Sequence, residues 1–423
     1  MEEEFQTVPV PEEASISWWN VAFMNSIFSL SLPTLLGGLE LAKVAPGWTF
    51  LWGTLAGGLL LAVIASFTGV IGSRTRLSSY MLAQIAFGTK GSLLLNLGFG
   101  LSLLGWFGVN IELFNDAAMQ LLIQVGYAGP DWPVKLGAGT MMTAAAFIGL
   151  KAINRLALLV TPVLGVAIVL MLVKLTDSGS IADILDRGPG TELAFGGVMS
   201  AIVGAVVVGA VIMPDTCRFI KGWKGAIGVS IIAYLIASTT VTAVGGLAGI
   251  ATGELDILAL MLALGLGFGA FAIVFGGSWT LNALNLYSAV LSVGAAAPKW
   301  PRRLVVILCG AGGTLFAFLH ILDFFIPFLI YLAVIFVPVG GIIIVDFFLL
   351  RQDDYLGDGY LRQSNWHWRA LVAWAAGTGF AVLAMEGVFT MTGTAAIDAI
   401  SVAACVHALL GWSQRHRPEE ATA

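Results

Sequence analysis

Long apolar runs dominate the sequence, and they leave few folds open to it. Residues 156–175 and 324–350 each contain about 20 or more successive residues with at most one acidic or basic side chain. That is the length an α-helix needs to cross a bilayer. The runs lack the two-residue alternation of a membrane β-barrel strand. Because backbone groups in hydrocarbon must be paired within their own segment, we expect an all-α integral membrane protein.

Composition supports the same class. Only 11% of the 423 residues are charged and 58% are hydrophobic, whereas a soluble domain carries about 25% charged residues. Such a chain cannot cover itself with a polar surface, so its solvent is the lipid bilayer. The three cysteines, Cys217, Cys309 and Cys405, are dispersed, which argues against a disulfide framework or a zinc site. The acidic first residues predict that there is no cleavable signal peptide.

We expect twelve transmembrane helices, and the basic residues orient them. Of the 20 Lys and Arg residues, 16 fall on the side of the two termini and 4 on the other side. Basic residues concentrate in cytoplasmic loops, so both termini are predicted to be cytoplasmic in a multi-pass cell-membrane protein. The expected spans lie near residues 19–41, 48–72, 92–125, 136–150, 156–175, 193–213, 225–249, 257–295, 304–320, 324–350, 369–388 and 394–412.

The first and sixth spans are interrupted by helix-breaking residues. Residues 19–41 contain Pro33 and adjacent glycines, and residues 193–213 are rich in glycine and are followed by Pro214. Because these spans are five apart, they predict broken helices 1 and 6 in an inverted-repeat transporter. Membrane helices are also rich in glycine simply because small residues allow close packing.

The third and eighth spans, also five apart, share a second pattern. Trp106 is followed four residues later by Asn110, and Trp279 is followed by Asn282 and Asn285. At helical spacing, each span can present an aromatic ring and an amide along one face. Because an unpaired amide in hydrocarbon is costly, each asparagine is expected to bind a ligand or to form an interhelical hydrogen bond.

Five segments resemble the nucleobase–cation symporter family one, and most closely its cytosine permeases. They are "SSYMLAQIAFGTKGS", "GWFGVNIE", "PDTCRFIKGWKG", "SWTLNALNLYSA" and "VPVGGIIIVDFFLLR", in that order. The resemblance extends from about Trp18 to Arg351. It implies a core of two inverted repeats of five helices, with two further helices after them, in agreement with the interruptions described above.

The resemblance also implies a substrate site. Trp106 is expected to stack on the substrate ring, together with Phe28 in the break of span one. The expected contacts in the break of span six are Ala205, Val206, Val208 and Gly209. Leu103 stands where the cytosine permeases carry glutamine. Val206 replaces a phenylalanine of those permeases, and Ala205 and Val208 replace two serines. Asn110 is a candidate to replace the lost amide, which leaves cytosine, a purine, a hydantoin or another small heterocycle as substrate.

The coupling ion is left open between sodium and protons. The family's sodium site corresponds to carbonyls of Asn25 and Phe28, a carbonyl near Gly277 and the hydroxyl of Thr280. The second hydroxyl of that site is replaced by Leu281, which weakens the sodium assignment. Glu112, an intramembrane carboxylate, is a candidate for proton coupling. It is also a candidate for a structural hydrogen bond.

These observations predict a cation symporter that imports a nucleobase or a related small heterocycle by alternating access. The alternative is a passive facilitator for a small polar solute. The four histidines are scattered, so we expect no enzyme and no cofactor. A monomer without nucleic-acid partners is expected. The expected regions are an acidic cytoplasmic tail (1–17), a first repeat (18–176), a second repeat (190–350), two additional helices (366–412) and a cytoplasmic tail (413–423).

Overall fold

The computed structural model describes most of the chain. The described residues are 8–148, 150–177, 179–188, 190–254, 256–263, 265–297, 299–361 and 364–415. Within them, the side chains of residues 27–28, 146–148, 150–161, 268, 272, 295–296, 358 and 413–415 are outside the description.

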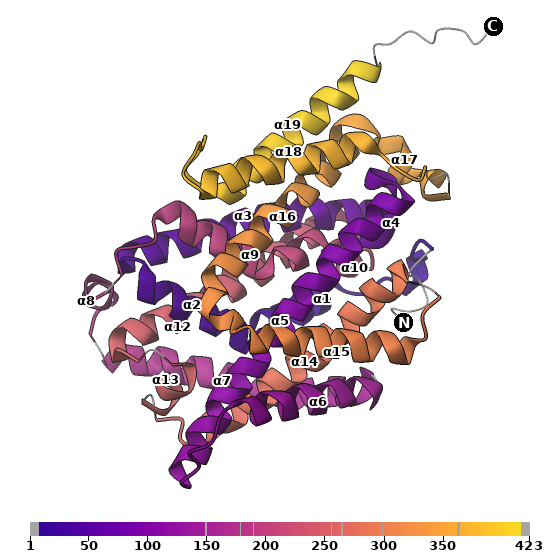
Figure 1. Cartoon of the computed structure of the whole chain (residues 1–423). Coiled ribbons are helices and arrows are strands. Elements are labelled where there is room, and N and C mark those ends of the chain that lie inside the picture. Colours follow the sequence, from indigo (N-terminus) through magenta and orange to yellow (C-terminus); the bar gives the residue numbers. More distant parts are fainter. Residues whose placement is uncertain are drawn as a thin grey trace, which may run out of the picture.

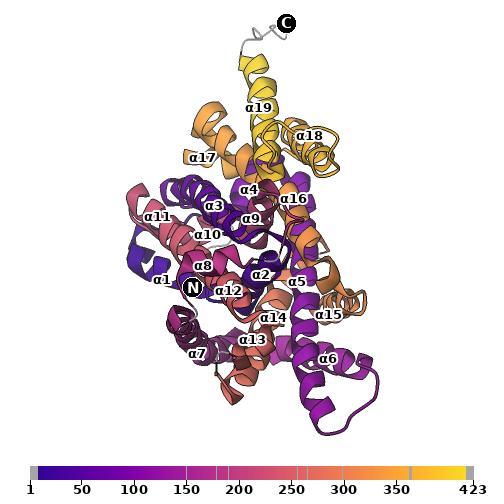
Figure 2. The same cartoon turned by 90° about the vertical axis from the view of Figure 1, so that its left-hand side faces the viewer.

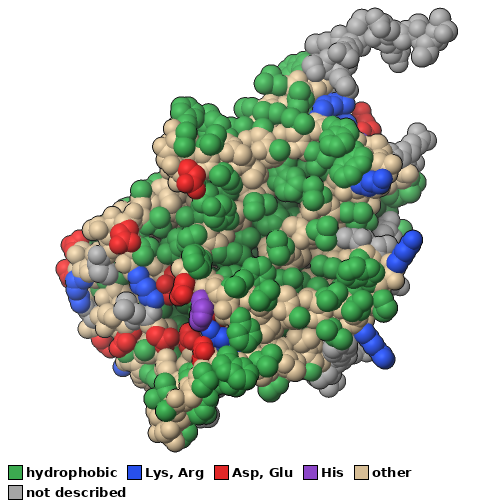
Figure 3. Space-filling model, viewed as in Figure 1, with side chains coloured by type: hydrophobic (Ala, Val, Ile, Leu, Met, Phe, Trp, Pro, Cys, Tyr) green, Lys and Arg blue, Asp and Glu red, His purple; other side chains and the backbone are tan. Residues whose placement is uncertain are grey.

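The described residues form an all-helical membrane protein with no strand beyond one isolated bridge between Ile16 and Ile220. In this part of the chain, seven helical segments are long and apolar enough to cross a membrane. Apolar side chains cover the middle of the surface in Figure 3, while acidic groups gather over the end that contains α8 (Ile181–Asp186). Below, this is called the acidic end. The opposite end is called the basic end and is formed by α4 (Ser79–Phe87), α17 (Gln352–Leu356) and the turn between α14 (Phe268–Ala296) and α15 (Arg302–Phe318).

The first predicted span is broken, as expected. α1 (Trp18–Ser29) ends and α2 (Leu32–Val44) begins after two non-helical residues. Pro33 has no N–H group, so it cannot donate to the carbonyl of Ser29 four residues earlier. That carbonyl instead accepts a hydrogen bond from the Ser31 N–H at 2.9 Å. The helix therefore ends at a point where the carbonyl that loses its helical donor keeps a hydrogen-bond partner.

The break in the sixth span lies later than the sequence suggested. α9 (Phe195–Val211) is a continuous helix, and α10 (Pro214–Cys217) follows it. The four residues that were expected in the break, Ala205, Val206, Val208 and Gly209, all lie within α9. The physical reason is Pro214, which cannot donate to the carbonyl of Ala210. The Thr68 hydroxyl of α3 (Gly47–Thr75) donates to that carbonyl at 2.7 Å. The prediction of a break at residues 205–209 is therefore wrong.

The third and eighth spans differ in regularity. α5 (Thr89–Gln124) is a single helix of 36 residues, about 54 Å long at 1.5 Å per residue. The eighth span, expected as one long helix, consists of α13 (Ile257–Ala263) and α14 (Phe268–Ala296). Gly265 and Gly267 between them have φ angles of 80° and 53°, which side chains with a Cβ rarely adopt.

The remaining elements surround these helices. α5 and α14 lie side by side, and α18 and α19 pack together against α16 at one edge (Figures 1 and 2). The other helices are α4 (Ser79–Phe87), α6 (Trp132–Ile148), α7 (Leu150–Asp177), α8 (Ile181–Asp186), α11 (Trp223–Ser230), α12 (Thr239–Thr252), α15 (Arg302–Phe318), α16 (Phe325–Val345), α17 (Gln352–Leu356), α18 (Trp368–Met385) and α19 (Ala395–Arg415). The 3₁₀ segments are η2 (Glu12–Ala14), η4 (Ile321–Phe324) and η6 (Asp358–Leu361), and the π-helical segments are η3 (Ile231–Ser238) and η5 (Asp346–Leu350).

Candidate functional site

The predicted site residues of α5 and α14 meet along an antiparallel seam. The rings of Phe114 and Phe275 lie 4.7 Å apart. Two turns away, the Asn282 amide donates to the carbonyl of Phe107 at 2.9 Å. These two contacts fix the register of the helices. They place Trp106 close to the level of Asn282, in the middle of the bundle.

Trp106 lies in an aromatic corner. Its half-buried ring contacts Phe325 and Phe328 of α16 edge-on, with centroid distances of 5.9 and 5.5 Å. Gly105 allows this approach, since a Cβ there would lie 2.7 Å from the Phe328 ring. Neither phenylalanine was predicted as a site residue, although the aromatic cluster "DFFIPF" at the start of this span was a signal that pointed to them.

Asn110 presents a hydrogen-bond acceptor next to Trp106. Its amide nitrogen donates to the carbonyl of Trp106 at 2.8 Å, and its side chain is fully buried. Because a carbonyl can only accept, this contact fixes which end of the amide is nitrogen. The Asn110 oxygen has no hydrogen-bond partner among the described residues. Leu103, one turn before Trp106, is half-buried and supplies no polar atom.

The two asparagines of α14 differ in their surroundings. Asn282 is fully buried, and its amide nitrogen contacts Phe107 of α5 and, at 3.0 Å, the sulfur of Met142 in α6. It therefore holds three helices together. Asn285 is partly buried.

The predicted α9 residues share one face of that helix. All four of them are partly buried, namely Ala205, Val206, Val208 and Gly209, whereas Val207 is fully buried. A Cβ on Gly209 would lie 2.9 Å from the hydroxyl oxygen of Tyr234. Glycine at this position therefore leaves room for the tyrosine. Tyr234 lies in the π-helical segment η3, a geometry often found at functional sites, and no local sequence pattern predicted it.

The predicted sodium ligands are less clearly assembled. Gly277 faces the start of α2, where a Cβ on it would lie 3.7 Å from the Leu32 Cβ. The Thr280 hydroxyl donates to its own helix at Gly276, at 2.7 Å. The Asn25 amide donates to Val21 and Thr216. Within the described part of the chain, no side-chain hydrogen bond joins Asn25 to Thr280. The side chain of Phe28, predicted for both sites, lies outside the described residues.

Glu112 belongs to a buried cluster near the acidic end. One carboxylate oxygen accepts the Leu322 backbone N–H at 2.8 Å, and the other lies 3.5 Å from both the Lys135 Nζ and the His320 Nδ1. Glu112 and Lys135 are 4% and 3% exposed. Lys135 also pairs with Asp131 at 3.0 Å. Glu112 thus connects α5, α6 and the turn before α16, and it points away from the stripe of Trp106.

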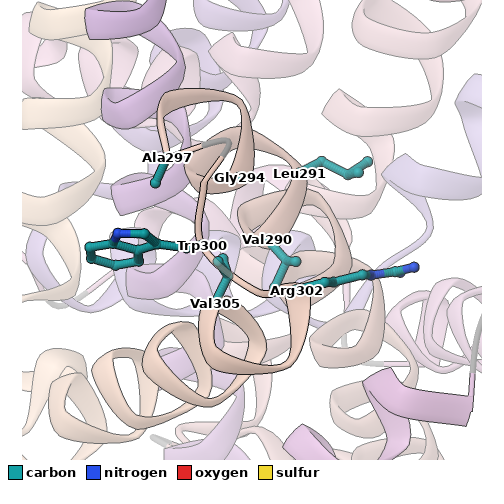
Figure 4. A pocket seen from close by; sticks show the side chains of 7 residues that line it. All are labelled: Val290, Leu291, Gly294, Ala297, Trp300, Arg302 and Val305. Carbon is teal, nitrogen blue, oxygen red and sulfur yellow. The ribbon is translucent and has the colours of Figure 1, made fainter.

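Two hollows open at opposite ends of the molecule. Near the acidic end, a hollow of about 350 Å³ is lined by Glu40, Glu192, Asp323 and the ring of Phe325, among others. At the basic end, a hollow of about 320 Å³ lies between the ends of α14 and α15 (Figure 4). The second is mostly apolar, and neither hollow is lined by any of the predicted site residues.

Comparisons with known proteins agree with this architecture. A family model described as "Permease for cytosine/purines, uracil, thiamine, allantoin" matches residues 7–412. The cytosine permease of Escherichia coli O157:H7 is 30% identical over 382 residues, which cover 88% of this chain and 87% of that protein. The cytosine permease of Escherichia coli strain K12 is 29% identical over the same length, with the same shares of the two chains covered.

Two solved structures share the fold. Mhp1 in an inward-facing conformation aligns with a TM-score of 0.82 at 17% identity, covering 98% of this chain and 95% of that chain. Mhp1, titled a nucleobase-cation-symport-1 family transporter in a closed conformation with bromovinylhydantoin bound, aligns with a TM-score of 0.73 at 18% identity. That alignment covers 99% of this chain and 97% of the Mhp1 chain.

Proposed function

Because the chain belongs to the family of permeases for cytosine/purines, uracil, thiamine and allantoin, we propose that it imports a nucleobase or a related small heterocycle with a cation. It is a multi-pass membrane transporter and not an enzyme, as the sequence predicted. Secondary active transport by alternating access fits the broken first span, because non-helical backbone in a membrane is tolerated where it lines a cavity or a binding site.

The observation that carries the substrate class is the pair formed by Trp106 and Asn110. Stacking of a heterocycle on an aromatic ring contributes about 1–3 kcal/mol. The Asn110 oxygen has no partner among the described residues and is a hydrogen-bond acceptor, so it favours a ring that presents an N–H group at that edge. The related permeases are named for cytosine, and the Mhp1 structure holds a hydantoin. Cytosine, a purine and a hydantoin all carry such N–H groups.

The other predicted site residues complete the proposal. The proposed pocket around the substrate ring is lined by the remaining predicted residues: Phe28, Leu103, Ala205, Val206, Val208 and Gly209. Asn285 lies at the edge of this proposed pocket. Asn282 supports the pocket from behind, since its amide is engaged by α5 and α6. Leu103 and the aliphatic α9 residues make this pocket less polar than that of the cytosine permeases. We therefore expect cytosine not to be the preferred substrate.

The proposed topology has twelve transmembrane helices. Residues 18–176 and 190–350 form inverted repeats, residues 366–412 form the two additional helices, and both terminal tails lie in the cytoplasm. The acidic end then faces outward and the basic end inward, in accordance with the positive-inside rule. The transporter functions as a monomer in the lipid bilayer.

The coupling ion is sodium or a proton. Sodium would use carbonyls of Asn25, Phe28 and Gly277 with the Thr280 hydroxyl. Proton coupling would involve Glu112. One cation per substrate, driven by 100 mV, supplies about 2.3 kcal/mol. This energy supports roughly fifty-fold accumulation.

Uptake of labelled bases into proteoliposomes, with sodium and proton gradients imposed separately, tests the proposal. A panel of cytosine, uracil, purines and hydantoins identifies the ring. Accumulation above the outside concentration under one gradient is expected. Uptake that never exceeds the outside concentration under either gradient would instead establish the passive facilitator.

A further inference from the structure

The short turn that precedes α16 is fastened to α5 through a carboxylate. The turn contains η4, and at His320 its backbone adopts the left-handed region with φ of 52°. The Leu322 N–H donates to Glu112 at 2.8 Å. An ionised carboxylate accepts such a bond about twice as strongly as a neutral group does. The charge of Glu112 therefore contributes directly to the position of this turn.

Phe325, three residues after Leu322, stands between the hollow at the acidic end and the Trp106 ring. It lines that hollow, and its ring centroid lies 5.9 Å from that of Trp106 in an edge-on contact. Only 2% of Phe325 is exposed. Phe325 thus contacts both the 350 Å³ hollow and the proposed stacking residue.

We propose that Glu112 is a positioning residue that holds the η4 turn in place, so that Phe325 closes the route from this hollow to Trp106. Neutralising Glu112 weakens the bond to Leu322 and releases the turn, which opens the route. This inference rests on the proposed substrate site at Trp106. It assigns to Glu112 control of access to that site.

The charges around Glu112 allow it to be neutralised without leaving Lys135 unpaired. Lys135, on α6, lies 3.5 Å from Glu112 but only 3.0 Å from Asp131. When Glu112 is neutral, Lys135 keeps Asp131 as its partner. His320 on the turn and Asp116 on α5 are the other titratable groups near Glu112.

The hollow itself adds three carboxylates. Asp323 lies on the turn, Glu40 on α2 and Glu192 before α9. Glu40 is paired with Lys43. These groups surround the entrance of the route and do not contact Glu112, so Glu112 is the only carboxylate found to tie the turn to α5 among the described residues.

The test measures access to the site and needs neither substrate nor transport. Leu103→Cys, introduced in a Cys405→Ser background, is labelled in proteoliposomes by a membrane-impermeant thiol reagent added outside. The native Cys217 and Cys309 are buried, and the unmodified background shows their contribution. Glu112→Gln is expected to speed labelling about tenfold, the shift that corresponds to exchanging a charge-assisted hydrogen bond for a neutral one.

Two controls make the result specific. Asp116→Asn removes an exposed carboxylate from the same helix, one turn away, and is expected to leave labelling unchanged. Phe325→Ala removes the ring itself and is expected to speed labelling in the presence of Glu112. If Phe325→Ala does not fold, Phe325→Leu is used instead. Labelling that is unchanged in a folded Glu112→Gln protein, or equally faster in Asp116→Asn, would overturn the proposal.

The pH profile separates gating from a merely structural role. With Glu112 present, labelling corrected for the reactivity of a model thiol should rise as the pH falls, whereas in Glu112→Gln it should be fast at every pH. A profile that persists in Glu112→Gln would contradict the inference. Failure of the uptake experiment above would count against the transport proposal but would leave this labelling result unaffected.

Discussion

Two buried carboxylates at opposite ends of the molecule are held in different ways. Near the basic end, Asp346 accepts hydrogen bonds from Arg351 at 2.5 and 3.1 Å, from the Tyr355 hydroxyl at 2.6 Å and from His407 at 3.0 Å. Near the acidic end, Glu112 has one short bond, to a backbone N–H, and the side chains of Lys135 and His320 lie 3.5 Å away.

The difference indicates which end is built to stay closed. The Asp346 cluster joins η5, α17 and α19, and its Arg351 also donates to the carbonyl of Ile85 at the end of α4, at 2.9 Å. A buried charge with every oxygen satisfied is costly to disturb. The Glu112 cluster has looser contacts and a cation with a second partner. We therefore expect changes at Asp346 to affect stability and changes around Glu112 to affect transport.

The largest expected effect is that of Asp346→Asn. Removing one partner of a buried ion pair typically costs about 3–5 kcal/mol, because the remaining charge is left without compensation. Glu112→Gln should cost less than about 3 kcal/mol, since it weakens one hydrogen bond to a backbone group. Thermal unfolding of both purified variants in detergent provides the measurement. Equal losses of stability would erase the distinction between the two clusters.

The next effect concerns Trp106, on the transport side of the comparison. Trp106→Ala should weaken substrate binding about fivefold to 150-fold, which corresponds to the 1–3 kcal/mol of one stacked base. Trp374→Ala is a matched control, because this tryptophan lies in α18, outside the proposed site, and donates to the carbonyl of Ile335 in α16 at 2.7 Å. The control should lower stability and leave affinity unchanged. Binding is measured by scintillation proximity on purified protein. Native affinity in a monodisperse Trp106→Ala protein would remove the stacking role.

The sequence predicted much of the fold because hydrophobicity and proline act locally. The apolar runs identified the membrane class, and Pro33 marked the real interruption between α1 and α2. The position of the break near Pro214 was predicted less well, because it lies after α9 and not at residues 205–209. Pro214 frees the carbonyl of Ala210, four residues earlier, but whether the helix ends there depends on Thr68, which is distant in sequence and supplies the replacement donor. A contact of this kind cannot be read from the local sequence.

The site was only partly predictable for a similar reason. Trp106 and Asn110 share a helix, so their spacing indicated a common face. Phe325, by contrast, approaches Trp106 from α16, and no local pattern pairs them. Glycine was equally ambiguous: the chain has 52 glycines, and only tertiary structure distinguishes Gly265 and Gly267, which split the eighth span.

A smaller effect is expected for Thr68→Val, near the basic end. The substitution keeps the shape of the side chain but leaves the carbonyl of Ala210 without its donor, which should cost about 1–3 kcal/mol. Thr140→Val is the matched control, since that exposed hydroxyl bonds only to its own helix, at Leu136. Unfolding in detergent should separate the two variants, with little change in the substrate affinity of either. An equally stable Thr68→Val protein would mean that the α9–α10 break is satisfied in another way.

The smallest effect tests the second partner of Lys135. The hydrogen bond from Lys135 lowers the pKa of Asp131 below its usual value near 3.8. A carboxylate with a lowered pKa in the folded state stabilises the protein above its unfolded pKa, and this contribution is lost as pH falls through the folded value. The Asp131 side chain is 42% exposed, so Asp131→Asn should cost only about 0.2–1 kcal/mol at pH 7. The difference from the native protein should disappear as the pH falls through the lowered pKa of Asp131 and shrink in 1 M salt.

The same variant sharpens the comparison of the two clusters. Without Asp131, Lys135 has only Glu112 as a carboxylate partner within ion-pair distance among the described residues, so Glu112 should become harder to neutralise. The pH-dependent labelling of Leu103→Cys should then begin at a lower pH in Asp131→Asn than in the native background, although the protein is barely less stable. An unshifted labelling profile would show that Lys135 does not exchange partners. The acidic end would then be held as firmly as the Asp346 cluster, and its carboxylate would have to be assigned a structural role.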